Sequence, residues 1–358
     1  MTRREILLDR VGGREAAALR VGGRLEDLLI DPAGDGPRQG DIFRARAGRP
    51  AKGAGGLFLD LPGDTRAFLR QARGISPGQP VIVQIAGTAE PGKAPPATLR
   101  IRLRSRLAVL TPGAPGVNIA RSIGPADREW LAPLAAAAMT GAPEGLILRS
   151  AAAAADAGEI AAEIAALRSR AATLTVDGPA PQLLLAGPRA HARALQDWPQ
   201  ADIVDSEGAF ARDGIAEDID ALLRPGVDLA GGGRLWIEPT RALVACDIDT
   251  GGDTSPAAGL KATLAAVAEL PRQLRLRGLG GQVVLDTAPF PHRDRGRVEQ
   301  ALQRALREDP VETTLVGWTP LGHLELNRQR ARIPLAETLP GGFATSHGTG
   351  KSEARQMR

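Results

Sequence analysis

Residues 234–249 read Arg-Leu-Trp-Ile-Glu-Pro-Thr-Arg-Ala-Leu-Val-Ala-Cys-Asp-Ile-Asp, and this stretch decides the type of fold. Leu235-Trp-Ile, a turn at 238–241 and the run 242–249 together predict a β-hairpin. The spacing of apolar residues then predicts a helix over 259–277, and residues 282–286 read as an apolar strand. Strands that alternate with helices indicate an α/β arrangement from about residue 176 onward.

Three carboxylates fall at the ends of the predicted strands. Side chains alternate between the two faces of a strand, so Asp247 and Asp249 share a face, and Asp286 joins them if its strand is adjacent. Like charges at such short range need a cation or shifted pKa values. Oxygen ligands alone suit Mg²⁺, which binds substrate phosphates and activates water. Three acids in solvated turns remain the alternative.

A basic segment lies upstream, at residues 38–106. It carries 13 Lys and Arg against 4 Asp and Glu, in a chain whose formal net charge is only +4. Such a segment indicates a polyanion site, with a solvated arginine-rich face as the alternative. Its strand-like runs are separated by Gly- and Pro-rich turns and fall at 41–47, 56–60, 67–70, 80–85 and 97–103. Five short strands in this length fit an OB-fold barrel.

Aromatic residues are scarce, with six Phe, four Trp and no Tyr. Phe58 and Phe68 fall on the second and third predicted strands of the barrel. On an OB surface, aromatic rings beside arginines stack on unpaired bases. Packing of both rings inside the barrel is the alternative.

Composition limits the class of protein. With 358 residues and 43% hydrophobic residues, the chain is expected to form several folding units with real cores. The single cysteine, Cys246, excludes a disulfide framework and a cysteine-based zinc site within one chain. We find neither a signal peptide nor an apolar run of membrane length, so we expect a soluble cytoplasmic protein without a membrane partner.

Three motifs in the second half resemble the ribonuclease E/G family of bacterial endoribonucleases. Residues 236–251, from Trp236-Ile-Glu-Pro-Thr-Arg to Asp247-Ile-Asp-Thr-Gly, are similar to the strand–turn–strand with the family's first catalytic aspartate. Residues 272–286 are similar to the helix and strand that follow it. Leu324-Glu-Leu-Asn-Arg-Gln-Arg330 resembles a late arginine motif, which implies that Arg328 and Arg330 contact RNA phosphates.

Two weaker motifs extend the resemblance upstream. The segments around Phe58 and Phe68 are similar to the phenylalanine motifs with which the family's OB domain contacts RNA. Residues 145–150, Gly-Leu-Ile-Leu-Arg-Ser, are similar to the segment that binds an RNA 5′-monophosphate. In that interpretation Arg149 makes a charge-assisted contact with the phosphate, and Ser150 supplies a hydroxyl.

The resemblance implies a multidomain chain of α+β and α/β type. The implied parts are a degenerate RNase H-like subdomain (1–35 and 176–233), an inserted OB-fold RNA-binding domain (36–106), a 5′-sensor region (107–175), a DNase-I-like catalytic subdomain (234–340) and a C-terminal tail (341–358). It also implies Mg²⁺-dependent cleavage of single-stranded RNA in RNA processing or decay, leaving a 5′-phosphate and a 3′-hydroxyl. Asp247, Asp249 and Asp286 would hold the metal.

The sequence departs from the family pattern at several positions. The family's second metal aspartate falls on Pro289, which cannot ligate, so a weak or inactive RNA-binding homologue is the alternative function. Phe343 and Ser346 occupy the places of the paired zinc-link cysteines, and the sequence ends without the small dimerisation domain. We therefore expect no zinc-linked tetramer.

Overall fold

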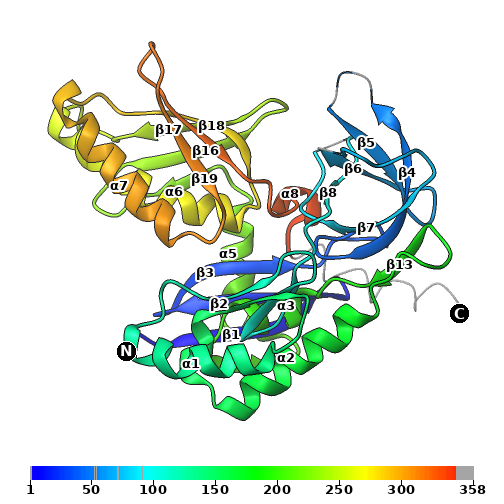
Figure 1. The fold of residues 1–358 in the computed structure, drawn as a ribbon. Coiled ribbons are helices and arrows are strands. Elements are labelled where there is room, and N and C mark those ends of the chain that lie inside the picture. The colour runs from blue at the N-terminus through cyan, green and yellow to red at the C-terminus, as the bar shows by residue number, and fades with distance from the viewer. Residues whose placement is uncertain (1, 52, 54, 71, 91, 344–358) are drawn as a thin grey trace, which may run out of the picture. The chain divides into compact units, whose positions relative to one another are not determined.

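The structure is a computed structural model, and it describes residues 2–51, 53, 55–70, 72–90 and 92–343. The chain divides into two compact units, one formed by residues 1–33 with 203–358 and the other by residues 34–202. Within the described residues the fold is mixed α+β, and its strands form four sheets (Figure 1). None of the helices described is long and apolar enough to cross a membrane. Most of the predicted tail, including Ser346, lies outside the described residues.

The first unit contains a four-stranded sheet in the order β14-β1-β2-β3. Its elements are β1 (Arg4–Val11), β2 (Arg14–Val21), β3 (Arg24–Ile30) and β14 (Asp202–Asp205), with helices α4 (Ala209–Arg212), α5 (Ile215–Leu222) and α8 (Leu335–Thr338). Strands and helices share one apolar core, in which Phe210 is fully buried. Asp9 accepts hydrogen bonds from the backbone N–H groups of Gly208 (3.1 Å) and Phe210 (2.8 Å), which fixes the start of α4 on β1.

The second unit contains a closed barrel of five strands, because β4 pairs with both β5 and β7. Its strands are β4 (Ile42–Ala51), β5 (Gly56–Asp60), β6 (Arg66–Arg70), β7 (Pro80–Ile85) and β8 (Pro96–Thr98). The OB-like barrel predicted from the sequence is confirmed, although its last strand ends at Thr98 rather than at residue 103. The strand β13 (Gln182–Leu185) pairs antiparallel with β4 at the barrel.

The remainder of the second unit is a four-stranded sheet, β11-β12-β10-β9, with helices beside it. The elements are β9 (Leu103–Arg104), β10 (Ala108–Thr111), β11 (Gly116–Ile119), α1 (Pro125–Ala138), β12 (Gly145–Leu148), η1 (Ser150–Ala154), α2 (Ala157–Ala172) and α3 (Ala190–Asp197). Asp156 caps α2 by accepting the backbone N–H of Glu159 at 2.8 Å. Ile160, Ile164 and Leu167, spaced by three and four residues, are buried along one side of α2.

The first unit also contains a six-stranded sheet in the order β15-β16-β17-β18-β20-β19 (Figure 1). Its elements are β15 (Gly226–Asp228), β16 (Arg234–Pro239), β17 (Val244–Asp249), α6 (Pro256–Leu276), β18 (Gly281–Asp286), η2 (His292–Asp294), α7 (Arg295–Glu308), β19 (Thr313–Trp318) and β20 (Leu324–Arg328). The predicted hairpin and the predicted helix are therefore confirmed. The strand β18 runs parallel to β17, because α6 carries the chain back across the sheet.

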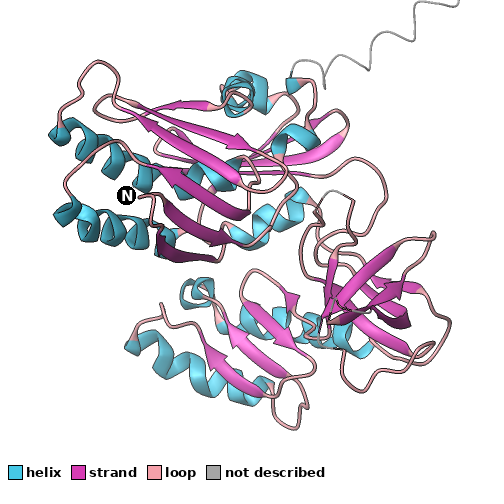
Figure 2. Ribbon diagram, turned by 90° about the horizontal axis from the view of Figure 1, so that it is seen from above, coloured by secondary structure: helices cyan, strands magenta, loops and turns pink. Residues whose placement is uncertain are grey.

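The helices α6 and α7 cover one face of this sheet. Figure 2 distinguishes the helices from the strands by colour. Alternate strand residues, such as Cys246 and Leu285, pack in one core with Leu270, Leu274 and Val298 of the helices. The residues between them, on the opposite face, are half-buried or exposed in β16, β17, β18 and β20. We call this opposite face the open face.

Candidate active site

Two carboxylates lie side by side on the open face. Asp247 of β17 and Asp286 of β18 are register partners in the parallel pair. Neighbouring strands are about 4.8 Å apart, and partners in register point to the same face. The two strands are thus adjacent, as the sequence argument required for Asp286 to join Asp247.

Asp249 is two residues further along β17 on the same face. Two residues of strand correspond to roughly 6.6 Å, so Asp249 is displaced from the pair along the strand. Its Oδ1 accepts the backbone N–H of Gly251 at 2.7 Å, which closes the turn after the strand. Its partner across the hairpin is Arg234.

The electrostatics of Asp247 reflect this crowding. The pKa of Asp247 lies above its ordinary value, first because part of the carboxyl group is removed from water, and next because of the charge of Asp286. Asp249 and Glu238 raise the pKa further, whereas the backbone N–H of Ile248 lowers it. Like charges gathered in this way favour a bound cation.

His323 also belongs to the site, although the sequence argument did not assign it a role. It directly precedes β20, which pairs with β18, and its Nδ1 lies 3.2 Å from Oδ1 of Asp286. Glu238, on β16, was missed as well. Glu238 lies in the predicted hairpin turn, next to the strand of Asp247, whereas His323 reaches Asp286 only through the strand order.

The donor set decides which metal the site could hold. Within the described part of the chain, no three His, Cys, Asp or Glu side chains gather closely enough to hold a metal ion by themselves. Mg²⁺ does not need such a set, because it keeps several waters and binds through one or two carboxylates plus substrate phosphates. The pair Asp247–Asp286 therefore fits Mg²⁺, whereas zinc sites use three or four protein ligands that include nitrogen or sulfur.

Pro289 follows β18 by three residues and is exposed. Its side chain has no atom that can ligate a metal. Its carbonyl packs against α6, since a Cβ added to Gly259 would lie 2.1 Å from that oxygen. The residue therefore shapes the loop after the strand, and Asp286 is the last carboxylate of β18.

Comparison with known proteins places these strands in a family. Residues 201–331, which include all of β15 to β20, match the family model described as the Ribonuclease E/G family. The chain belongs to the ribonuclease E/G family. Ribonuclease G of Escherichia coli (strain K12) is 28% identical to it, across 97% of this chain and 84% of its own. Ribonuclease E of Nostoc sp. is 30% identical across 72% of this chain and 44% of its own, and ribonuclease E of Haemophilus influenzae is 27% identical across 93% and 42%.

In this ribonuclease E/G family member, the late arginine motif does not lie beside the carboxylates. Arg328 is only 2% exposed, which favours a structural role, and its contact with RNA phosphates stays a prediction. Its guanidinium donates to Thr313 Oγ1 at 2.8 Å and to Asp309 Oδ1 at 3.1 Å, and burial lowers its pKa. Arg330 is half-buried and packs against Gly281 at the start of β18, whereas Asp286 ends that strand.

The two phenylalanines lie outside the barrel core. Phe58 and Phe68 are cross-strand partners, with ring centroids 5.3 Å apart in an edge-to-face arrangement, and Phe58 is 40% exposed. The core beneath them is filled by the alternate residues of the same strands, such as Leu59 and Leu69. The alternative that both rings pack inside the barrel is thus wrong, and they form a solvent-facing aromatic pair.

Arg149 lies in a cluster of charged groups in the second unit. Its guanidinium donates to the carbonyl oxygens of Ser105 (2.7 Å) and Gln196 (2.8 Å) and pairs with Asp197 at 3.2 Å. Arg104, which the sequence argument did not single out, is within electrostatic reach of both Arg149 and Asp197. Ser150 is exposed at the start of η1. Binding of a 5′-phosphate by Arg149 and Ser150 stays a prediction.

Phe343 stands at one of the predicted zinc-link positions. It is 6% exposed and packs in the core shared by β1–β3 and α4–α5. Its backbone N–H donates to Asp220 at 2.9 Å. The absence of a zinc-linked tetramer stays a prediction.

Proposed function

We propose that this chain is an endoribonuclease that cleaves single-stranded RNA with Mg²⁺ held by Asp247 and Asp286, leaving a 5′-phosphate and a 3′-hydroxyl. Its family relatives named ribonuclease G and ribonuclease E support the endoribonuclease activity. The observation that carries the metal site is the register pairing of Asp247 with Asp286 on the open face.

Each side chain of the site has a role in this proposal. Asp247 and Asp286 bind the ion, which when bound activates water and neutralises charge on the phosphodiester. His323 orients the Asp286 carboxylate through its Nδ1 contact. Asp249 holds the turn after β17 and adds negative charge that favours the cation.

The proposal also covers how the RNA is held and where the enzyme works. The exposed Phe58–Phe68 pair supports selection of single strands, because an unpaired base can stack on an exposed ring. We further propose a DNase-I-like relationship for the six-stranded sheet and an RNase H-like one for the sheet β14-β1-β2-β3. RNA processing or decay in the cytoplasm is the proposed setting.

A cleavage assay tests this function. The wild-type protein is expected to cut a 5′-monophosphorylated single-stranded RNA with Mg²⁺ and to lose this activity with excess chelator. Asp247→Asn should abolish cleavage. Glu308→Gln, an exposed acid at the end of α7, is the matched control and should cleave like the wild type. Equal cleavage by the Asp247→Asn protein would remove the proposed site.

Pro289 motivates the second candidate, an RNA-binding homologue without catalysis. It predicts salt-sensitive RNA binding without cleavage at any Mg²⁺ concentration. In that case Pro289→Asp is the variant to test for restored activity. Turnover by the unmodified protein excludes this candidate.

A further inference from the structure

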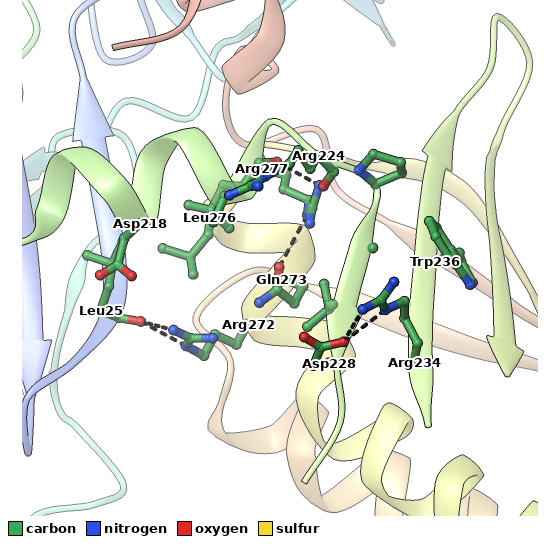
Figure 3. Close-up of a pocket in the computed structure, with 15 residues that line it drawn as sticks. Leu25, Asp218, Arg224, Asp228, Arg234, Trp236, Arg272, Gln273, Leu276 and Arg277 are labelled. Carbon is green, nitrogen blue, oxygen red and sulfur yellow. Dashed lines mark hydrogen bonds and ion pairs between the residues drawn. The ribbon is translucent and has the colours of Figure 1, made fainter. Parts of the chain in front are cut away.

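A hollow of about 610 Å³ lies at the edge of the six-stranded sheet, between α5, β15, β16 and the end of α6 (Figure 3). Its lining includes four arginines, Arg224, Arg234, Arg272 and Arg277, together with Trp236. A smaller hollow of about 250 Å³ shares Asp228, Arg234 and Trp236 with it and reaches Asp249. The two hollows thus lead from the sheet edge to the carboxylate face.

Arg277 is the buried cation of this hollow. It is 7% exposed, and no carboxylate of the described residues forms an ion pair with it. Its Nη1 donates to the carbonyl oxygens of Leu222 (2.6 Å) and Arg224 (2.7 Å), and its Nε donates to Gln273 at 3.2 Å. Burial lowers its pKa to about 10, so it stays protonated at neutral pH. A buried charge without a counter-charge is costly, and an anion in the hollow would compensate it.

The carbonyl oxygens at the end of α5 compensate part of this charge, because the C-terminus of a helix is electronegative. These carbonyl oxygens accept hydrogen bonds from Nη1 of Arg277 only. Nη2 makes none of the hydrogen bonds described for Arg277. Arg224, in the same wall, is exposed and has no ion pair within the described part of the chain. By contrast, Arg272 pairs with Glu269 at 2.5 Å and Arg234 with Asp228 at 2.6 Å. Two guanidinium groups are therefore left for an anion.

Trp236 supplies a flat apolar surface beside these cations. The guanidinium of Arg234 lies 5.4 Å from the centre of its ring. Across the strands its partner is Gly226, and a Cβ added there would come within 3.1 Å of the indole. On its other side, Trp236 is the register partner of Asp247. An aromatic ring with nearby arginines, next to the proposed cleavage site, has the chemistry that binds a base and its phosphate.

We propose that this hollow binds one nucleotide of the RNA strand, with its base against Trp236 and its phosphate on Arg224 and Arg277. The inference rests on the proposed function, since it places the nucleotide next to the carboxylates. It assigns to the chain a nucleotide subsite on the first unit, separate from the aromatic pair of the barrel. The hollow's volume suits a nucleoside monophosphate unit, whether free or within a strand, and its four arginines outnumber the two aspartates that also line it, Asp218 and Asp228.

Photo-crosslinking locates the bound nucleotide directly. A single-stranded RNA with one 4-thiouridine, and free 4-thiouridine monophosphate in a second arm, are irradiated with the protein in chelator, which prevents cleavage. We expect a crosslink on the tryptic peptide 235–241, which contains Trp236. Crosslinking by both probes assigns the hollow to a nucleotide as such, and crosslinking by the strand alone assigns it to a position of the strand. No crosslink on this peptide with either probe overturns the proposal.

Affinity measurements separate binding from folding. Trp236→Leu and Arg224→Gln should each weaken binding of a fluorescent single-stranded RNA by about tenfold in chelator, as expected for loss of a stacked base or a phosphate contact. Arg224 is exposed, so its variant should fold normally, whereas Arg277→Gln also removes a helix cap. Trp130→Leu and Arg304→Gln, at exposed residues that do not line the hollow, are the matched controls. Equal affinity of test and control variants overturns the proposal.

Failure of this proposal and failure of the proposed function give different results. Cleavage with Mg²⁺ but no crosslink at Trp236 removes the subsite and keeps the enzyme. A crosslink at Trp236 without cleavage keeps the subsite and favours the RNA-binding homologue.

Discussion

The two faces of the six-stranded sheet are built from the same strands but differ in polarity and burial. Toward α6 and α7, Cys246, Ile248 and Leu285 are buried among apolar neighbours. The open face carries Asp247, Asp249 and Asp286, and Asp247 and Asp286 repel each other across one strand spacing. The covered face therefore provides the stability that holds like charges close together on the other face.

Substitutions of the open-face carboxylates should change the rate of RNA cleavage most, and to different extents. Asp286→Asn should lower the rate of RNA cleavage about as much as Asp247→Asn, by roughly a thousandfold, since either change removes a ligand of the proposed ion. Asp249→Asn should lower it by less than about tenfold, because an asparagine Oδ1 still accepts the Gly251 N–H. Single-turnover cleavage rates at saturating Mg²⁺ measure all three. A loss with Asp249→Asn as large as with Asp286→Asn would contradict the division between them.

The next effect compares neighbouring residues of β18 that point to opposite faces. Leu285 is fully buried, so Leu285→Ala should lower the free energy of unfolding by about 2–5 kcal/mol. Val284, on the open face, is half-buried, so Val284→Ala should cost less than about 1.5 kcal/mol. Urea unfolding followed by circular dichroism gives both values. Equal losses would mean that the open face is packed in the same way as the covered one.

The barrel offers the same comparison on a smaller scale, in RNA binding rather than stability. Phe58 and Phe68 lie outside a core that their strand neighbours fill. Replacing either ring by leucine should weaken binding of single-stranded RNA by about tenfold while the barrel stays folded. Fluorescence anisotropy measures the affinity, and thermal unfolding is the control. An unchanged affinity with both variants would remove the aromatic pair from the RNA interface.

The Asp247 carboxyl should make the stability of the folded protein depend on pH, and this effect should be small. Because the folded protein raises the pKa of this carboxyl, the folded state binds the proton more tightly than the unfolded chain, and stability falls as pH rises through the folded pKa. Asp247→Asn should therefore raise the melting temperature at pH 7 by roughly 1–3 °C, a small gain because the group is largely solvated. The gain should vanish below pH ~4, where both states are protonated. A lower melting temperature for Asp247→Asn at pH 7 would contradict the crowding of charges.

Local patterns predicted much of the fold. Alternation placed Asp247 and Asp249 on one face, and Gly- and Pro-rich turns separated the five strands of the barrel. In the barrel, alternation did not show whether Phe58 and Phe68 point inward, because it defines the two faces of a strand without saying which face is buried. The outward face followed only from the core that Leu59 and Leu69 form.

The parts of the site that escaped prediction depend on contacts between distant segments. His323 reaches Asp286 because β20 pairs with β18, and a sequence does not give the order of strands. Arg328 looked like an exposed arginine after a strand, but an ion pair with Asp309, buried with it, holds its side chain inside. The hollow beside Trp236 joins α5, β15 and α6, so no single segment indicates it.

If Asp247 and Asp286 form one Mg²⁺ site, the protein should bind the ion through both carboxylates without RNA. Isothermal titration calorimetry with Mg²⁺, and with Mn²⁺ as a second probe, would compare the wild type with Asp247→Asn, Asp286→Asn and the control Glu308→Gln. We predict one site in the wild type and the control, weakened at least tenfold in each aspartate variant. Binding that is unchanged in both aspartate variants would contradict this site.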